Sequence, residues 1–303
     1  MKSTERISAK ILVSLLSRRV SREMTFTVTI VSQHGIWQSS DLRLTKPGTR
    51  KVEDDFSIKQ ISFRCPDGAA LLTYAGAGRV YSVHISDWIR QFLRGESYTV
   101  DQTLIQIREH ATRDLGELLK KCDLKHMFSI GAYIRGIPWV AQIRNFSVTP
   151  HLGEGLVEHE FQTAALRVPD GTGMVVPWPC ILSREDLALL INVSSKRPRK
   201  PKEFSDLLAE VNLRTARSAN SRGTVSEYCV TTYQPPSNEG LQSCVHNAPA
   251  EMKPIFPADL LFGIDVTEVM RELISKRPIS EAIAIPEKII KDTVTPKNLL
   301  RRK

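Results

Sequence analysis

The sequence has no long apolar run, and this excludes one class of protein. Its longest apolar stretches, such as Ile11–Leu16 and Met174–Leu182, are far shorter than the roughly 20 residues that cross a bilayer as a helix. The second stretch is also interrupted by Pro177 and Pro179. We therefore predict a chain without a transmembrane helix.

Cysteine is also scarce. The five cysteines are widely spaced, at Cys65, Cys122, Cys180, Cys229 and Cys244. No two of them have C-x-x-C spacing, and no histidine stands at the spacing of a zinc ligand. Together with the absence of a secretion signal, this favours reduced thiols, a cytoplasmic location and no structural zinc. We expect no metal and no other cofactor.

Acidic residues are fewer than basic ones, 33 against 42 in 303 residues, which gives a formal net charge of +9. The excess is local, because residues 1–24, 196–203 and 291–303 together carry +12 and the rest of the chain carries −3. A nucleic-acid-binding face needs basic charge spread over a folded surface, so these short runs argue against one. The composition, 41% hydrophobic and 25% charged, is that of an ordinary folded chain.

The first 24 residues differ in pattern from the rest of the chain. Apolar residues recur there at helical spacing among basic ones, which predicts a short basic amphipathic helix. A secretory signal needs a longer apolar stretch and a small-residue cleavage site. We expect residues 1–24 to be a propeptide or to lie upstream of a true start at Met24. The remaining alternative is a surface helix that persists.

From Thr25 the apolar period changes to two, which predicts strands. The expected strands and turns are a run from residue 25, the turn Gln33-His34-Gly35, a run from Ile36, the pair Ile58–Phe63 and Ala69–Ala75 joined by Pro66-Asp67-Gly68, the pair Met127–Ile134 and Trp139–Val148, and single strands at Glu160–Val168 and Val225–Tyr233. Apolar residues three and four apart predict helices at Val83–Leu93, Val100–Lys121, Arg184–Val193 and Glu203–Arg217.

This order of elements is not the regular alternation of a parallel doubly wound sheet. It predicts an α+β fold of antiparallel sheets with helices packed outside them, over residues 25–233. Residues 234–303 are Pro-rich and basic, and we expect them to form a loosely attached tail with one helix at Val266–Lys276.

Several short motifs come one after another at characteristic distances from Thr25. They are Thr25-Phe-Thr-Val-Thr-Ile-Val, Gly35, Ser40-Asp41-Leu42-Arg43 with Thr45, Lys59 before Gln60-Ile61, and Tyr74-Ala75-Gly76-Ala77-Gly78 before a predicted helix. In this ordered set the chain resembles the proteasome β-type subunits and their bacterial relatives, members of the N-terminal nucleophile hydrolases. The resemblance covers residues 25–148 well and extends weakly to Tyr233.

The resemblance implies a four-layer αββα sandwich and a threonine-type hydrolase of amide or peptide bonds that works through an acyl-enzyme. A threonine at the N-terminus carries its own base, the α-amine, whose pKa near 8 suits proton acceptance. Thr25 would be the nucleophile, and Lys59 and Asp41 would tune it. The backbone N–H of Gly76 would face the oxyanion. We expect Arg43 to brace the Asp41 loop.

The chain departs from the family pattern at three places. Ser221 matches a family serine before the last long strand, but Ser218 stands where an Asp is expected. The family's Gly-Ser-Gly turn has its counterpart in Gly171-Thr172-Gly173, without the helix pattern that should come after it. Met24 precedes Thr25, whereas family propeptides are cut after a glycine. Removal of an initiator methionine at position 24 would expose Thr25 instead.

Simpler interpretations of the same residues remain. Thr25 is a common residue at the edge of a strand, Lys59 alone is typical of a solvated strand position, and Gly76 is typical of a strand-to-helix turn. A second hypothesis is therefore an inactive structural or scaffold subunit of the same fold. A third and weaker one is a nucleic-acid-associated protein that uses the basic runs.

The resemblance also implies partners. These are a peptide or protein substrate, other copies of the chain in a homo-oligomer, and an ATPase. No membrane partner is expected.

Overall fold

The structure is a computed structural model that describes residues 25–45, 51–80, 82–149, 153–178, 182–198, 200–221, 223–236, 240–249 and 257–270. The predictions made for residues 1–24 and for the basic end of the tail lie outside these ranges. Within them the chain is α+β, as predicted, with two large sheets, four complete helices and a helical segment at 266–270.

The first sheet has five strands in the order β12-β1-β2-β13-β14, and every neighbouring pair is antiparallel. Its strands are β1 (Thr27–Ser32), β2 (Gly35–Asp41), β12 (Gly173–Trp178), β13 (Cys229–Gln234) and β14 (Gln242–His246). All residues of β1 and β2 are buried, because both faces of this sheet are covered.

The second sheet has seven strands in the order β11-β10-β9-β6-β5-β15-β16. Its strands are β5 (Gln60–Cys65), β6 (Gly68–Ala75), β9 (Met127–Ile134), β10 (Ile137–Thr149), β11 (Gly153–Arg167), β15 (Ala258–Leu261) and β16 (Ile264–Asp265). Two short pairs complete the strands, namely β3 (Leu44–Thr45) with β4 (Val52–Asp54), and β7 (Arg79–Val80) with β8 (Val83–His84).

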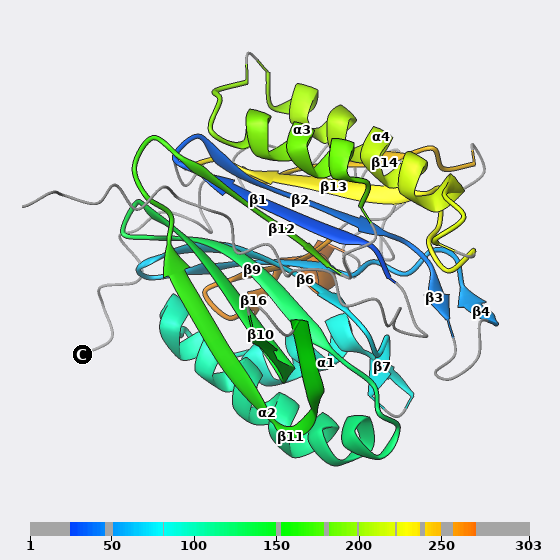
Figure 1. The fold of residues 1–303 in the computed structure, drawn as a ribbon. Coiled ribbons are helices and arrows are strands. Elements are labelled where there is room, and N and C mark those ends of the chain that lie inside the picture. The colour runs from blue at the N-terminus through cyan, green and yellow to red at the C-terminus, as the bar shows by residue number, and fades with distance from the viewer. Residues whose placement is uncertain are drawn as a thin grey trace, which may run out of the picture.

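Two helices lie on the outer face of each sheet (Figure 1). The helices α3 (Arg184–Ser194) and α4 (Pro201–Arg217) cover the five-stranded sheet, where α4 contacts β2 and β13 and α3 contacts β12. The helices α1 (Ile85–Leu93) and α2 (Val100–Lys121) lie on the seven-stranded sheet. The start of α2 is fixed by a capping box, in which Thr99 accepts from the Gln102 backbone and the Gln102 side chain accepts from that of Thr99.

Apolar side chains fill the spaces between helices and sheets. Val28, Ile30 and Trp37 of the five-stranded sheet pack against Phe204 and Leu208 of α4. A larger cluster joins the seven-stranded sheet to α1 and α2. The alternation seen in the sequence explains this arrangement, since Val28 and Ile30 face α4 while Thr29 reaches across to Ser129 of the other sheet.

Two elements differ from the sequence prediction. β12 was not predicted, yet it pairs with β1 along its whole length. Its Pro177 lies at the open edge of the sheet, where a missing N–H costs no ladder hydrogen bond. Strand β11 is 15 residues long and starts earlier than the predicted residue 160.

The segment after residue 234 is more closely attached than the expected loose tail. β14 pairs with β13, and β15 adds to the edge strand β5 in parallel, so the seven-stranded sheet is mixed rather than antiparallel. Residues 266–270 are helical, and the rest of the helix predicted at Val266–Lys276 lies outside the described ranges. The Pro-rich composition of this segment does not indicate strands. The short strands β14 and β15 form because they pair with β13 and β5, not because of the β-propensity of their own residues. The division of the chain at residue 233 stays a prediction.

In the part of the chain that the structure describes, no helix is long and apolar enough to cross a membrane.

Candidate active site

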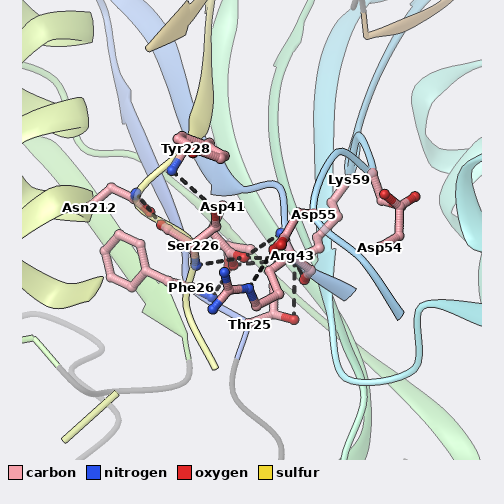
Figure 2. Close-up of polar contacts among 12 residues, drawn as sticks. Thr25, Phe26, Asp41, Arg43, Asp54, Asp55, Lys59, Asn212, Ser226 and Tyr228 are labelled. Atoms are coloured by element: carbon pink, nitrogen blue, oxygen red, sulfur yellow. Dashed lines mark hydrogen bonds and ion pairs between the residues drawn. The ribbon is translucent and has the colours of Figure 1, made fainter. Parts of the chain in front are cut away.

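Thr25, Asp41 and Lys59 come together at one end of the two sheets, although they are far apart in the sequence (Figure 2). Thr25 lies two residues before the start of β1, Asp41 ends β2, and Lys59 stands just before β5. Lys59 thus reaches across from the seven-stranded sheet to the five-stranded one. Its Nζ lies 3.4 Å from Thr25 Oγ1 and 3.2 Å from each carboxylate oxygen of Asp41.

Asp41 is held by backbone donors as well as by lysine. Its Oδ2 accepts from the N–H of Phe26 at 2.7 Å and its Oδ1 from the N–H of Arg43 at 2.8 Å. The N–H of Ser226 lies 3.5 Å from Oδ1. Because Phe26 comes directly after Thr25, the hydrogen bond to Phe26 fixes the chain that carries the Thr25 hydroxyl.

Burial sets the electrostatics of this group. Asp41 and Lys59 are fully buried, whereas Thr25 keeps 9% of its surface exposed, so the hydroxyl is on the one residue of the three that solvent reaches. Burial raises the pKa of Asp41 against the opposing attraction of Lys59, and it lowers the pKa of Lys59 against the attraction of Asp41. Burial thus disfavours the charged form of each side chain, and mutual attraction and hydrogen bonds oppose this effect.

Arg43 braces the loops around this group. Its carbonyl accepts from Lys59 Nζ at 2.5 Å, its Nε lies 2.5 Å from Asp55, and its Nη1 donates to the carbonyl of Gly223 at 2.6 Å. One side chain thus ties the loop before β5 to the loop after α4. These contacts agree with the bracing role that we expected for Arg43. The hydrogen bond from Lys59 to the Arg43 carbonyl was not expected.

Sequence reasoning also missed Asn212. Its side chain is fully buried in α4 and donates to the carbonyl of Ser226 at 2.9 Å, which holds the backbone that faces Asp41. A signal was available, because Asn212 lies four residues after Leu208 on the apolar stripe of α4. A polar residue on such a stripe indicates a specific hydrogen bond.

Gly76 comes directly after β6 and has a φ of +110°, a conformation that favours glycine. A Cβ at this position would lie 2.4 Å from the carbonyl oxygen of Lys125 and 2.9 Å from the Cα of His126. The close packing of Gly76 against the segment before β9 is thus a sufficient reason for glycine at this position, without any role in catalysis. The predicted oxyanion role of the Gly76 N–H stays a prediction.

Ser221 is buried in the loop after α4, and its hydroxyl lies 2.7 Å from the carbonyl oxygen of Ala216 and 2.9 Å from that of Ser218. Ser218 in turn donates to Thr215. Both serines therefore close the end of α4. Among the described residues neither serine has a hydrogen bond to Thr25, Asp41 or Lys59, which are the three predicted residues that the structure joins by hydrogen bonds.

A polar cavity of about 210 Å³ adjoins the segment that carries Lys59. Ser57 and Gln60 line it from that segment, and Asp54, His84 and Asp87 are among its other lining residues. Nowhere in the described ranges do three or more His, Cys, Asp or Glu side chains form a group that could hold a metal ion.

Comparison with known proteins finds similar solved structures. No protein-family model matches the chain, and no curated protein does. An Anbu (ancestral beta-subunit) from Yersinia bercovieri is 16% identical with a TM-score of 0.47, over 74% of this chain and 89% of that one. A helical assembly of the Anbu complex from Pseudomonas aeruginosa is 16% identical with a TM-score of 0.48, over 74% and 88%. Anbu from Hyphomicrobium sp. strain MC1 is 15% identical with a TM-score of 0.46, over 84% and 98%.

These comparisons correct the family named from the sequence. The similar structures belong to Anbu, a distinct proteasome-like group, and not to the proteasome β-type subunits themselves.

Proposed function

We propose that the chain is a threonine-type amidohydrolase or endopeptidase with Thr25 as its nucleophile. The observation that supports this most is the buried Lys59, whose Nζ donates to Thr25 Oγ1 at 3.4 Å while Asp41 holds it from the other side. A lysine is not buried at this position without reason, since desolvation of its charge is costly. A hydroxyl beside a fixed positive charge gives up its proton more readily, which favours nucleophilic attack.

In the proposed reaction Thr25 is the first residue of the mature chain. Its α-amine takes the hydroxyl proton as Oγ1 attacks the substrate carbonyl, and Lys59 stabilises the negative charge that develops on Oγ1. The proton then passes to the departing amine, which leaves Thr25 esterified to the acyl group. Water hydrolyses this ester and restores the hydroxyl. Gly76 is proposed as the donor to the oxyanion.

The other finer expectations belong to the same proposal. A four-layer αββα sandwich is supported by the contacts of α3 and α4 with one sheet and of α2 with the other. A cytoplasmic location is supported by the free thiols of the four described cysteines. A homo-oligomer and a peptide or protein substrate are proposed with it, and an ATPase partner stays a prediction.

The test is covalent labelling of the purified protein by an electrophile directed at N-terminal threonine, followed by mass spectrometry. The proposal predicts a chain that begins at Thr25 and one adduct located on Thr25. Thr25→Ala and Lys59→Met should abolish labelling, and Thr172→Ala, at an exposed turn, is the matched control. A chain that begins upstream and leaves Thr25 unlabelled would contradict the proposal.

The second candidate is an inactive scaffold subunit of the same fold. It is favoured by Ser218 in place of the expected Asp and by the use of the Ser221 hydroxyl inside its own loop. Its test is Thr25→Ala in cells of the source organism. The scaffold function predicts an unchanged phenotype and unchanged assembly, whereas the hydrolase predicts loss.

A further inference from the structure

Two rows of polar side chains face each other between the sheets. In the five-stranded sheet Thr29, Gln38 and Thr232 are cross-strand partners in one row. In the seven-stranded sheet Ser129, Thr73 and Gln60 form the matching row. We call these six residues the polar seam. All are buried.

Hydrogen bonds join the two ends of the seam across the sheets. Thr29 Oγ1 lies 2.9 Å from Ser129 Oγ at one end, and Thr232 Oγ1 donates to Gln60 Oε1 at 2.5 Å at the other. In the middle, Gln38 Nε2 donates to the carbonyls of Leu71 and Ser129 at 3.0 and 3.1 Å. The two sheets are thus connected by polar side chains and not only by apolar packing.

The middle of the seam is not satisfied by protein atoms. Gln38 Oε1 and Thr73 Oγ1 have no hydrogen-bond partner among the described residues, and neither has Ser40 Oγ. All three side chains are fully buried. Buried polar atoms almost always have a partner, and an unpaired one costs about 1–3 kcal/mol.

The register places Gln38 and Thr73 in the middle of the two facing rows, which are joined at both ends. Gln38 and Ser40 are two residues apart in β2 and face the same way. Ser40 is the partner of Val230, whose carbonyl accepts from Gln60, and Gln60 is the partner of Thr73. One hydrogen bond between the sheets, from Gln60 to Val230, thus joins the partner of Thr73 to the partner of Ser40.

Ser40 and Thr73 have short side chains. Packed sheets lie about 10 Å apart, and the hydroxyls of Ser40 and Thr73 stand only one carbon from their Cα atoms, so they do not close that distance by themselves. A water molecule in a protein interior typically has about three hydrogen-bond partners. Two hydroxyls and one amide oxygen supply that number.

We propose that the middle of the polar seam and the neighbouring Ser40 form a buried water-binding site, in which at least one ordered water molecule is held by Gln38 Oε1, Thr73 Oγ1 and Ser40 Oγ. The water completes the connection between the two sheets. It also lies beside the candidate site, because Ser40 directly precedes Asp41 in β2. The proposal does not depend on whether Thr25 is catalytic.

The sign of a stability change tests the site. Thr73→Val keeps the shape of the side chain and removes the hydroxyl. If the hydroxyl binds water, the variant leaves Gln38 Oε1 and Ser40 short of a partner, and the unfolding midpoint falls by about 2–4 °C. If the hydroxyl has no partner, replacing it with a methyl group raises the midpoint instead.

A double-mutant cycle tests whether Ser40 and Thr73 bind the same water molecule. Ser40→Ala should also lower the midpoint, and the combination with Thr73→Val should cost clearly less than the two single effects together, because both act through one water. Thr103→Val is the control, since its buried hydroxyl donates to the Thr99 carbonyl at the start of α2. Its effect should add to that of Ser40→Ala.

Magnetic relaxation dispersion of water ¹⁷O counts long-lived buried water molecules directly. We expect the wild-type protein to show at least one more than Thr73→Val, or than Ser40→Ala should the first variant fail to fold. Equal counts, or additive effects in the cycle, would overturn the proposal.

Discussion

Lys59 Nζ lies 3.2 Å from both carboxylate oxygens of Asp41, and water reaches neither side chain. A buried ion pair of this kind contributes little net stability compared with an apolar pair, but removing one partner leaves an uncompensated charge. The pair is therefore better explained by a role in positioning or chemistry than by stability.

Lys59→Ala tests how strongly the two charges depend on each other. We expect the free energy of unfolding to fall by about 3–5 kcal/mol, because the Asp41 carboxylate loses the buried cation beside it while its surroundings stay dry. Denaturant unfolding measures the loss. The double variant Lys59→Met with Asp41→Leu should recover much of it.

The matched control is Lys202→Ala, which removes a lysine 2.6 Å from Asp206 on an exposed face of α4. This pair is screened by water, so we expect no resolvable change. If Lys59→Ala proved as harmless as Lys202→Ala, the Asp41 carboxylate would have to be uncharged in the folded protein.

We expect His126 to make the stability of the protein depend on pH. It is fully buried, its ring centroid lies 4.5 Å from that of Phe128, and neither ring nitrogen has a hydrogen-bond partner among the described residues. Burial lowers the pKa of His126 to about 3. The unfolded chain binds a proton near its ordinary pKa of about 6.5, but the folded chain does not.

Stability from His126 is therefore fully present above a pH of about 6.5 and is lost as the pH falls from there toward the folded-state pKa of about 3. The slope reaches about 1.4 kcal/mol per pH unit in that window. Unfolding measured from about pH 7 to about pH 4 should show it, and His126→Leu should remove that part of the slope. Parallel pH profiles for wild type and variant would contradict the expectation.

Gly76→Ala tests the close approach of the end of β6 to the segment before β9. Both Gly76 and Gly95 have positive φ, +110° and +89°, so alanine is strained at either position. Only at Gly76 would the new Cβ meet a carbonyl oxygen, at 2.4 Å, while nothing lies within 4 Å at Gly95. We expect urea unfolding to show a loss of about 1–2 kcal/mol for Gly95→Ala and about 1–3 kcal/mol more for Gly76→Ala. Equal losses of unfolding free energy for the two variants would mean that the backbone at the end of β6 moves to make room for the new Cβ.

The sequence predicted the bounds of helices and strands well where apolar side chains alternate along a strand or recur on one face of a helix. The helix predicted at Val100–Lys121 is α2 with the same bounds, because its capping residue Thr99 and its apolar stripe mark both ends. Strand β9 also has its predicted bounds, and β6 starts one residue before the predicted Ala69. The spacing of Asp41 and Lys59 from Thr25 also led to three side chains that do lie together.

Other parts of the structure could not be predicted because they depend on the rest of the fold. β12 contains Pro177 and is a strand only because β1 offers it a partner. The hydrogen bonds from Asn212 to Ser226 and from Ser226 to Asp41 depend on how α4 lies over the sheet, so the partners could not be predicted even though Asn212 stands out on its apolar stripe. Short strands such as β15 likewise have too few residues for any periodicity.

The last prediction concerns Arg90 of α1, which holds β15 and β16 at the edge of the seven-stranded sheet through its contact with Asp265. The Arg90 side chain is almost fully buried and contacts Asp265 of β16 at 2.7 Å, Glu268 at 3.2 Å and Asp87 at 2.7 Å. Arg94, which is half exposed, also contacts Asp265 at 2.7 Å. The parallel strand β15 has only four residues, so its ladder alone is weak.

Arg90→Ala should therefore release this segment before the rest of the fold. Among the described residues, the buried Asp265 keeps the half-exposed Arg94 as its remaining cation, besides the backbone N–H of Glu268, and the Glu268 side chain loses its contact with Arg90. Hydrogen exchange at Leu260 and Leu261 should become roughly tenfold faster or more, while exchange in β9 stays as in the wild type. Arg94→Ala keeps the buried contact and should change the same amides far less. If exchange rose equally in β9 and β15, Arg90 would support the whole sheet rather than the attachment of its last two strands.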